Sequence, residues 1–255
     1  MTGSRCCAVP RWLPILLAAW GLAFAAHSFA APQSETPKAL RAIYLQAISS
    51  PVRTEGDRSA DAKRKPLEFL QFSKVRPGMQ VLDVAAGGGY TTQLLALVVG
   101  SKGKVWAQGP ETSRVLQARL ANHYQANIVP VAQPFEDPVP DNAPKLDLIT
   151  LIMNYHDIAY MPVDREKMNR RLFDALKPGG HLVVLDHSAT PGSGVSVAKT
   201  LHRIDEKVVL DEELKAGFKL EQESNFMRNP ADPRDKAFFN MTIPTDKFAL
   251  RFVKP

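Results

Sequence analysis

Cysteine is scarce in this 255-residue sequence. The two cysteines present, Cys6 and Cys7, both lie within the first ten residues. Everything after them therefore has no disulfide and no thiolate ligand for a metal, and its stability must come from packing. Long apolar runs are missing as well. The run over residues 13–26 falls short of the roughly 20 residues that a membrane-spanning helix needs.

Several signatures of ligand-binding sites are also absent. No Gly-Lys-Ser or Gly-Lys-Thr follows a glycine-rich segment, which excludes a P-loop. The spacing G-x-G-x-x-G fails at its third glycine, where Thr92 stands, so a nicotinamide-dependent oxidoreductase is only a minor alternative. The histidines follow no standard ligand pattern such as H-x-x-x-H, and we expect no metal site. No internal repeat or low-complexity tract is present.

The first thirty residues have the features of an export signal. Arg5 and Arg11 precede the short apolar run, and a small-x-small ending follows at residues 28–31. This order predicts a signal peptide over residues 1–30 and export to a bacterial periplasm. The alternative is a membrane anchor left by an uncleaved signal. After cleavage we expect no stable membrane insertion.

The net charge of +6 is modest and spread along the chain. The one short basic run, residues 63–65, is explained by a solvated helix face. Together with the predicted export, this charge distribution leads us to expect no nucleic-acid partner. We expect a small-molecule substrate and predict no partner protein.

Residues 31–65 are predicted to form a linker and an N-terminal helical lid. Apolar spacing predicts one helix over residues 38–49, and a densely charged segment, residues 53–64, leads into a second helix over 65–74. The charged side chains Arg53, Asp57, Arg58 and Arg64 either form an ion-pair network or touch substrate, and we favour the network.

A strand, a glycine-rich turn and a helix follow one another over residues 80–99. The apolar run over residues 80–84 ends near Asp83, and Gly87, Gly88 and Gly89 precede a helical pattern that reaches Val99. Three consecutive glycines carry no Cβ, so a ligand can approach this backbone closely. The sequence therefore predicts a ligand site at this turn.

Strand and helix patterns then alternate to the end of the chain. Strands are predicted at residues 104–107, 127–131, 146–153, 181–186, 219–224 and 247–254, and helices at 114–125, 162–176, 201–210 and 211–216. This alternation predicts one α/β domain over residues 66–255, with a Rossmann-like, doubly wound sheet preceded by N-terminal helices.

Polar residues follow two of the predicted strands at the edge where such sheets bind ligands. Asn154, His156 and Asp157 follow one strand, and His187 follows the next. We expect His156 to act as a general base near neutral pH, with Asp157 orienting it, and His187 and His202 to converge on them. The alternative is that residues 154–157 cap a helix and bind nothing.

The glycine turn resembles the first motif of class I S-adenosylmethionine-dependent methyltransferases, D-x-G-x-G-x-G. Asp83, Gly87 and Gly89 match it, and Ala85 replaces its first glycine. The Lys-Pro-Gly-Gly at residues 177–180 and the final two-strand ending are similar to that family too. The resemblance implies a mostly parallel seven-stranded sheet with an antiparallel C-terminal strand, and makes residues 66–255 a methyltransferase-like domain.

The resemblance also implies S-adenosyl-L-methionine as the cofactor and a set of residues that bind it. These are Asp83, Ala85, Ala86, Gly87, Gly88, Gly89, Tyr90, Gln108 and Asn154. Gln108 stands where the family has an acidic residue that holds the ribose, and Gln133 lies near a second position that is often acidic. Because both positions are neutral here, we expect a lower affinity for the nucleoside than in the rest of the family.

A narrower resemblance concerns the whole predicted mature chain. The leader, the Asn-Tyr-His-Asp at residues 154–157 and the Asp-His-Ser at residues 186–188 are similar to a group of exported bacterial proteins described as predicted methyltransferases. We therefore expect a methyltransferase acting on a small or medium acceptor. The alternative is a non-catalytic exported protein that binds a ligand on a methyltransferase scaffold.

Overall fold

The computed structural model describes residues 1–4 and 36–255. Residues Thr36–Pro255 form one compact unit. Most of the predicted signal peptide, residues 5–30, and residues 31–35 of the predicted linker lie outside the described residues. Among the residues that are described, no helix is both long and apolar enough to span a membrane.

Three helices precede the sheet: α1 (Pro37–Ile48), α2 (Glu55–Arg64) and α3 (Pro66–Ser73). The predictions for α1 and α3 are confirmed. The charged segment, for which the sequence indicated no regular element, is α2. Its first turn is fixed by a capping box, because Thr54 accepts from the backbone of Asp57 and the Asp57 carboxylate accepts from the backbone of Thr54.

The remaining elements alternate along the chain. They are β1 (Gln80–Val84), α4 (Tyr90–Val99), β2 (Lys104–Gly109), α5 (Arg114–Asn122), β3 (Ile128–Ala132), β4 (Leu146–Ile152), α6 (Tyr155–Tyr160), α7 (Arg165–Ala175), β5 (Leu176–His187), α8 (Ala198–Leu201), α9 (Glu206–Ala216), β6 (Lys219–Ser224), the 3₁₀ helix η1 (Phe238–Asn240) and β7 (Lys247–Val253).

The seven strands form one sheet in the order β3-β2-β1-β4-β5-β7-β6. The pairs from β3 to β5 are parallel, and β7 runs antiparallel to both β5 and β6. The predicted fold, a Rossmann-like doubly wound sheet with an antiparallel C-terminal strand, is confirmed.

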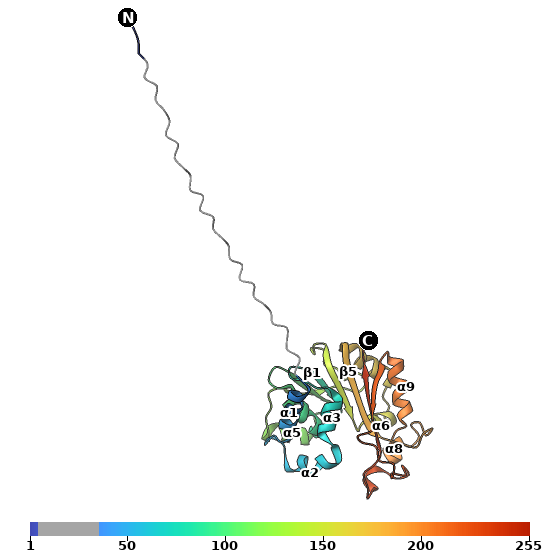
Figure 1. Ribbon diagram of the computed structural model, residues 1–255. Coiled ribbons are helices and arrows are strands. Elements are labelled where there is room, and N and C mark those ends of the chain that lie inside the picture. Colours follow the sequence, from blue (N-terminus) through green and yellow to red (C-terminus); the bar gives the residue numbers. More distant parts are fainter. Residues whose placement is uncertain (5–35) are drawn as a thin grey trace. The chain divides into compact units, whose positions relative to one another are not determined.

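Two apolar cores cover the two faces of the sheet, as the alternation of side chains along each strand requires. Leu82 and Val84 of β1 enter the core shared with α7 and α9. Val81 enters the core shared with α1, α3 and α4. In Figure 1, α1, α3 and α5 accordingly lie on one side of the sheet and α9 on the other. The central strands are thus buried on both faces, as their near-continuous apolar sequences indicate.

Two segments differ from their predictions. The Lys-Pro-Gly-Gly segment is not a separate turn: β5 already begins at Leu176, and the pairing of β4 with β5 shifts register between Leu146 and Leu148 to accommodate the extra residues. The helices predicted over residues 201–210 and 211–216 are one helix, α9, and it begins only at Glu206, because the Asp205 side chain caps it by accepting from the backbone of Lys207.

The strand order reverses between β1 and β4, and this is where sheets of this kind bind ligands. The carboxyl ends of β1, β4 and β5 meet at this edge. The antiparallel β7 begins at the same edge, since Lys247 pairs with His187 in register. The functional site is assembled from these strand ends.

Candidate functional site

The glycine turn between β1 and α4 is held open by its backbone conformation. Gly87 and Gly89 have positive φ angles of 53° and 80°, a region that side chains with a Cβ rarely adopt. A Cβ on Gly89 would lie 2.8 Å from Leu116 Cδ1, so α5 packs directly against the turn. Glycine is therefore required at position 89 both by conformation and by space.

Asp83 fixes the start of the turn. Its two carboxylate oxygens accept hydrogen bonds from the hydroxyls of Thr92 and Thr150, at 2.6 and 2.7 Å. Complete burial raises the pKa of Asp83 to about 6, although these hydroxyls favour the charged form. The side chain ties the turn to α4 and β4.

Gln108 lies behind the turn rather than over it. Its Oε1 accepts from the backbone N–H of Ala85, and its Nε2 donates to the carbonyl of Gln133. The side chain is buried and both ends of the amide are used by the backbone. Gln108 thus supports the turn, and its predicted contact with the cofactor has no support from this geometry.

A cavity of about 310 Å³ lies over the turn, and we call it the loop cavity. Ten of the residues predicted to form the site line it: Asp83, Ala85, Ala86, Gly87, Gly88, Tyr90, Asn154, His156, Asp157 and His187. Three predicted residues do not, and they are Gly89, Gln108 and His202. Arg64, Arg119 and Phe238 also line it, and the sequence analysis did not assign them to the site.

Two ion pairs, one buried and one partly buried, hold helix α2 beside this cavity. Arg53 binds Asp61, whose carboxylate also accepts from the Tyr90 hydroxyl at 2.7 Å. Asp57 binds both terminal nitrogens of Arg119. The prediction that the charged residues of this segment form an ion-pair network is confirmed for Arg53 and Asp57.

Arg119 and Arg64 connect this network to the turn. Arg119 Nε donates to the carbonyl of Gly88 at 2.7 Å. The Arg64 guanidinium lies 4.6 Å from the centre of the Tyr90 ring, a cation–π contact. Among residues 36–255 it has no carboxylate within ion-pair distance. Arg64 therefore leaves a positive charge beside the cavity.

The Asp57–Arg119 pair predicts a stability change in acid. Burial raises the pKa of Asp57, but the Arg119 guanidinium and the Thr54 backbone outweigh it and lower the pKa to about 2. The pair thus stabilises the fold fully above the ordinary carboxyl pKa of 3.8, and this contribution is lost as pH falls toward 2. We expect Asp57→Asn to cost about 1–2 kcal/mol at pH 6, a difference that shrinks between pH 4 and pH 2.

Urea unfolding of both proteins at several pH values measures this difference. Glu55→Gln is the matched control, because Glu55 lies in the same helix but is 84% exposed and pairs only with Arg58. A cost for Asp57→Asn that does not change between pH 6 and pH 2 would contradict the assigned role of the ion pair.

The histidines converge at the ends of β4 and β5. His156 Nδ1 lies 2.7 Å from Asp186 Oδ1, and the other Asp186 oxygen accepts from the His156 backbone. The ring centre of His156 is 5.8 Å from that of His187 and 5.5 Å from that of His202. Asp157 Oδ1 lies 3.3 Å from His156 Nε2 and 3.1 Å from His202 Nδ1. The predicted convergence is confirmed.

The protonation of these histidines differs from the expectation. Burial lowers the pKa of His156, but the carboxylates of Asp157 and Asp186 outweigh it and raise the pKa to about 9. Burial, together with the charges of Lys247 and His156, lowers the pKa of His187 to about 2. At neutral pH His156 therefore keeps its proton and His187 is neutral, which argues against His156 as a base that titrates near pH 7.

A second cavity, of about 410 Å³, adjoins the loop cavity, and we call it the aromatic cavity. The two share Arg64, Met153, His187 and Phe238 as lining residues. The remaining lining residues of the aromatic cavity are Lys63, Phe239, Met241, Thr242, Ile243, Pro244, Thr245 and Lys247. The Phe238 ring stacks on His187 with a centroid distance of 4.7 Å.

Lys247 is the principal residue that the sequence analysis missed. Its side chain is buried, and burial together with the Arg203 charge lowers its pKa to about 8. The predicted topology could have indicated Lys247. An antiparallel last strand begins at the edge where the parallel strands end, so its first residue lies near the ligand site at that edge. In the sequence, Lys247 had only been placed at the start of a strand.

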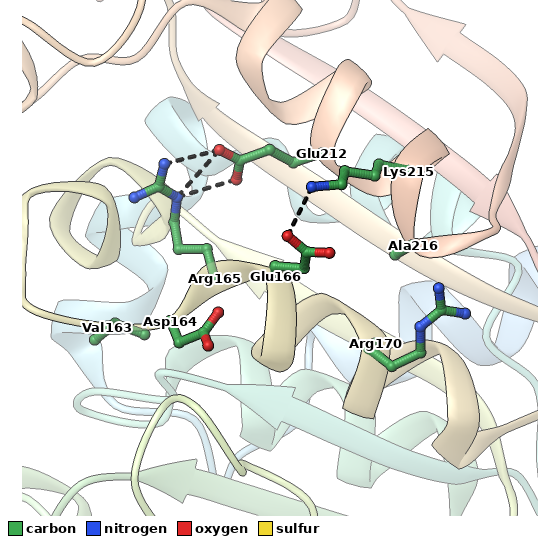
Figure 2. Close-up of a pocket in the computed structure, with 8 residues that line it drawn as sticks. All are labelled: Val163, Asp164, Arg165, Glu166, Arg170, Glu212, Lys215 and Ala216. Carbon is green, nitrogen blue, oxygen red and sulfur yellow. Dashed lines mark hydrogen bonds and ion pairs between the residues drawn. The ribbon is translucent and has the colours of Figure 1, made fainter.

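A third cavity, between α7 and α9, lies away from the glycine turn. Its charged residues are largely paired with each other (Figure 2): Arg165 binds Glu212, and Lys215 binds Glu166. The Glu212 carboxylate also accepts from the Tyr155 hydroxyl at 2.6 Å. The polar groups of this cavity therefore bind mainly one another, and these contacts hold α7 against α9.

The model of the ubiE/COQ5 methyltransferase family matches residues 63–205. The chain is 34% identical over 128 residues to the ubiquinone/menaquinone biosynthesis C-methyltransferase UbiE of Ectopseudomonas mendocina, covering 49% of this chain and 47% of that protein. It is 32% identical over 118 residues to UbiE of Cupriavidus metallidurans, covering 46% of each. The chain thus spans about half the length of the curated relatives it matches.

Among solved structures, the chain is similar to a SAM-dependent methyltransferase from Aquifex aeolicus. The TM-score is 0.59 at 19% identity, over 77% of this chain and 93% of that one. The N-methyltransferase NodS from Bradyrhizobium japonicum gives a TM-score of 0.53 at 15% identity, over 81% of this chain and 98% of that one. At these identities the likeness concerns the fold.

Proposed function

We propose, because the chain belongs to the ubiE/COQ5 methyltransferase family, that it transfers a methyl group from S-adenosylmethionine to a small aromatic acceptor. The observation that carries this proposal is the loop cavity, which lies over a glycine turn at the reversal point of the sheet and opens beside a second, aromatic cavity. One cavity is suited to the cofactor and the other to the acceptor.

The residues of the loop cavity suit S-adenosylmethionine in part. The turn at Gly87 and Gly88 exposes backbone to the cavity, as the methionine and ribose portions require, and Asn154 adds a polar amide. Gln108 is not available to bind the ribose hydroxyls, so the hydrogen bonds to these hydroxyls must come from other groups. The bound cofactor would supply an electrophilic methyl group on its sulfonium sulfur.

The residues of the aromatic cavity suit a planar acceptor that carries a hydroxyl. Phe238 and Phe239 offer apolar ring faces, and Lys247 places a cation among them. The UbiE relatives are named for C-methylation in ubiquinone and menaquinone biosynthesis. By analogy we propose a phenol-like or quinol-like acceptor, which becomes a better nucleophile when a nearby cation stabilises its oxyanion.

In this reading, methyl transfer depends mainly on alignment and on the exclusion of water. His187 borders both cavities and is neutral, and its Nδ1 is held by the Thr245 hydroxyl at 2.8 Å. It is therefore placed to position the acceptor at the boundary. Lys247 stabilises the negative charge of the acceptor oxygen.

We expect Lys247→Met to lower kcat/KM for a hydroxylated aromatic acceptor by at least about 100-fold, the loss typical when one donor to an oxyanion is removed. The KM of the wild-type protein for the acceptor is expected to rise above about pH 8, where Lys247 loses its charge, and this rise is absent in the variant. Transfer of labelled methyl from S-adenosylmethionine to a panel of phenols and quinols measures both.

Lys199→Met, at an exposed position outside both cavities, is the matched control and should behave as the wild-type protein. Equal activity of Lys247→Met and the control would remove Lys247 from the proposal. Tight cofactor binding without transfer to any acceptor would instead favour the non-catalytic ligand-binding alternative.

We propose further that the protein is exported, as the leader over residues 1–30 indicates, and that it acts in a bacterial periplasm. The resemblance to exported predicted methyltransferases supports the same location. Cell fractionation with mass spectrometry of the N-terminus tests this: a chain that begins near residue 31 supports export and cleavage. An intact leader in the membrane fraction would indicate the anchored alternative, and an intact leader in the cytosol would refute export.

A further inference from the structure

Hydrogen bonding explains the arrangement of His156, Asp157 and His202 only in part, because it accounts for the contact between Asp157 and His202 but not for that between Asp157 and His156. His156 Nε2 is buried and has no hydrogen-bond partner among the described residues. Asp157 Oδ1 lies 3.3 Å away and forms an ion pair with the protonated ring. A bound cation would displace the proton from Nε2 and give this buried nitrogen a direct partner.

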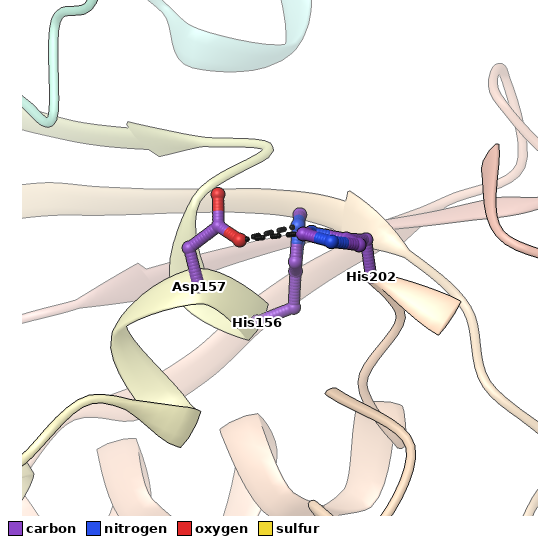
Figure 3. A group of neighbouring side chains, drawn as sticks. All are labelled: His156, Asp157 and His202. Carbon is purple, nitrogen blue, oxygen red and sulfur yellow. Dashed lines mark hydrogen bonds and ion pairs between the residues drawn. The ribbon is translucent and has the colours of Figure 1, made fainter. Parts of the chain in front are cut away.

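The Asp157 oxygen lies from each of the two ring nitrogens at the spacing of neighbouring ligands of one ion. His202 Nδ1 lies 3.1 Å from Asp157 Oδ1, and all three ligand atoms lie within 4.8 Å of one another. Bonds of about 2.0–2.1 Å in a tetrahedral site place neighbouring ligand atoms roughly 3.3 Å apart. Figure 3 shows the two imidazoles meeting at the Asp157 carboxylate.

The surroundings of His156 are those of a metal-ligating histidine. Such a residue donates its other ring N–H to a carboxylate, which fixes the orientation of the ring. Here Asp186 occupies that position, 2.7 Å from Nδ1, and it is fully buried. Asp186 also accepts from the backbone N–H groups of His156 and His187, so its own position is fixed.

We propose that His156 Nε2, Asp157 Oδ1 and His202 Nδ1 bind a divalent d-block cation such as Zn²⁺. Two histidines and one carboxylate form a donor set that such ions favour, with coordination positions left open. His156 and Asp157 line the loop cavity, so a ligand in that cavity can reach the open positions. The proposal concerns ion binding alone and does not depend on methyl transfer.

The spacing of the three residues explains why the sequence did not predict this site. His156 and Asp157 are adjacent in α6, but His202 follows α8, 45 residues after Asp157. Standard ligand patterns are local, whereas this set is assembled only when α8 packs against α6.

Titration of the full-length, chelator-treated protein with Co²⁺, followed by visible absorption and then by competition with Zn²⁺, tests the site. We expect one ion per chain. Asp157→Asn and His202→Gln should each weaken binding by at least about 100-fold, more than the loss of an outer partner usually causes. Both side chains are partly exposed, at 29% and 27%, so these variants are expected to fold.

His123→Gln, which alters a histidine outside the cluster, is the matched control and should bind as the wild-type protein does. Thermal unfolding without metal confirms that each variant is folded. Absence of stoichiometric binding to the wild-type protein would overturn the proposal. So would Asp157→Asn and His202→Gln proteins that are folded and bind with unchanged affinity.

Discussion

Replacing Gly88 with leucine is expected to lower the affinity for S-adenosylmethionine by at least about 100-fold, or nearly 3 kcal/mol, while leaving the fold intact. Gly88 lines the loop cavity, and its φ angle is not positive, so the backbone accepts a side chain there. The added Cβ would lie 3.0 Å from Val115 Cγ1, and Val115 is 63% exposed and free to adjust. The rest of the leucine occupies the space that the cofactor needs.

Calorimetry with S-adenosylmethionine measures the loss, and Gly56→Leu is the matched control. Gly56 lies exposed in α2, outside the loop cavity, where a new Cβ meets only Thr54 Oγ1 at 3.7 Å. We expect this control to bind as the wild-type protein does. If Gly88→Leu retained wild-type affinity, the cofactor would have to bind elsewhere.

Replacing Asp232 with alanine is expected to destabilise the protein by about 3–5 kcal/mol, because it leaves a buried guanidinium without its counter-charge. Arg203 and Asp232 form an ion pair in which both side chains are fully buried, at 2.7 Å. Asp232 also accepts from the backbone N–H groups of Arg234 and Asp246. The pair therefore anchors the loop between β6 and β7, which carries Phe238 of the two cavities.

Urea unfolding measures this cost, and Asp211→Ala is the control. Asp211 pairs with Lys207 at the surface, where both side chains are more than half exposed, and its loss should be barely measurable. We expect Asp232→Ala also to weaken acceptor binding, because the loop is released. A stability close to that of the Asp211→Ala protein would show that the buried pair does not hold the loop.

The sequence was sufficient for the fold because the signals for it are local. The strand over residues 219–224 was predicted with the bounds of β6, and the strand over residues 80–84 with those of β1. The strand over residues 80–84 is an apolar run that leads into the glycine turn, and the strand over residues 219–224 follows the helix-ending Gly217. Helix α2 was missed because its sequence is charged on nearly every side, and a capping box together with ion pairs stabilises it instead of an apolar stripe.

The site was predictable only where its residues follow a strand directly. His156, Asp157 and His187 stand at the ends of β4 and β5, and parallel strands bring their carboxyl ends together. Lys247 and Phe238 come from the far end of the chain, and they reach the site through the antiparallel β7 and the loop before it.

The contacts of the Gln108 side chain could not be predicted from the sequence. The sequence predicts Gln108 just after the strand over residues 104–107, whereas it lies within β2. The sequence also could not show that backbone groups of Ala85 and Gln133 use its amide. The orientation of a buried amide depends on contacts between segments that are distant along the chain, and no local pattern encodes them.

The most direct test is calorimetric titration of the wild-type protein with S-adenosylmethionine and with its demethylated product, S-adenosylhomocysteine. Saturable binding of both at one site per chain, at concentrations well below millimolar, is the expected result. Absence of binding of either compound up to millimolar concentration would contradict the assignment of the loop cavity to this cofactor.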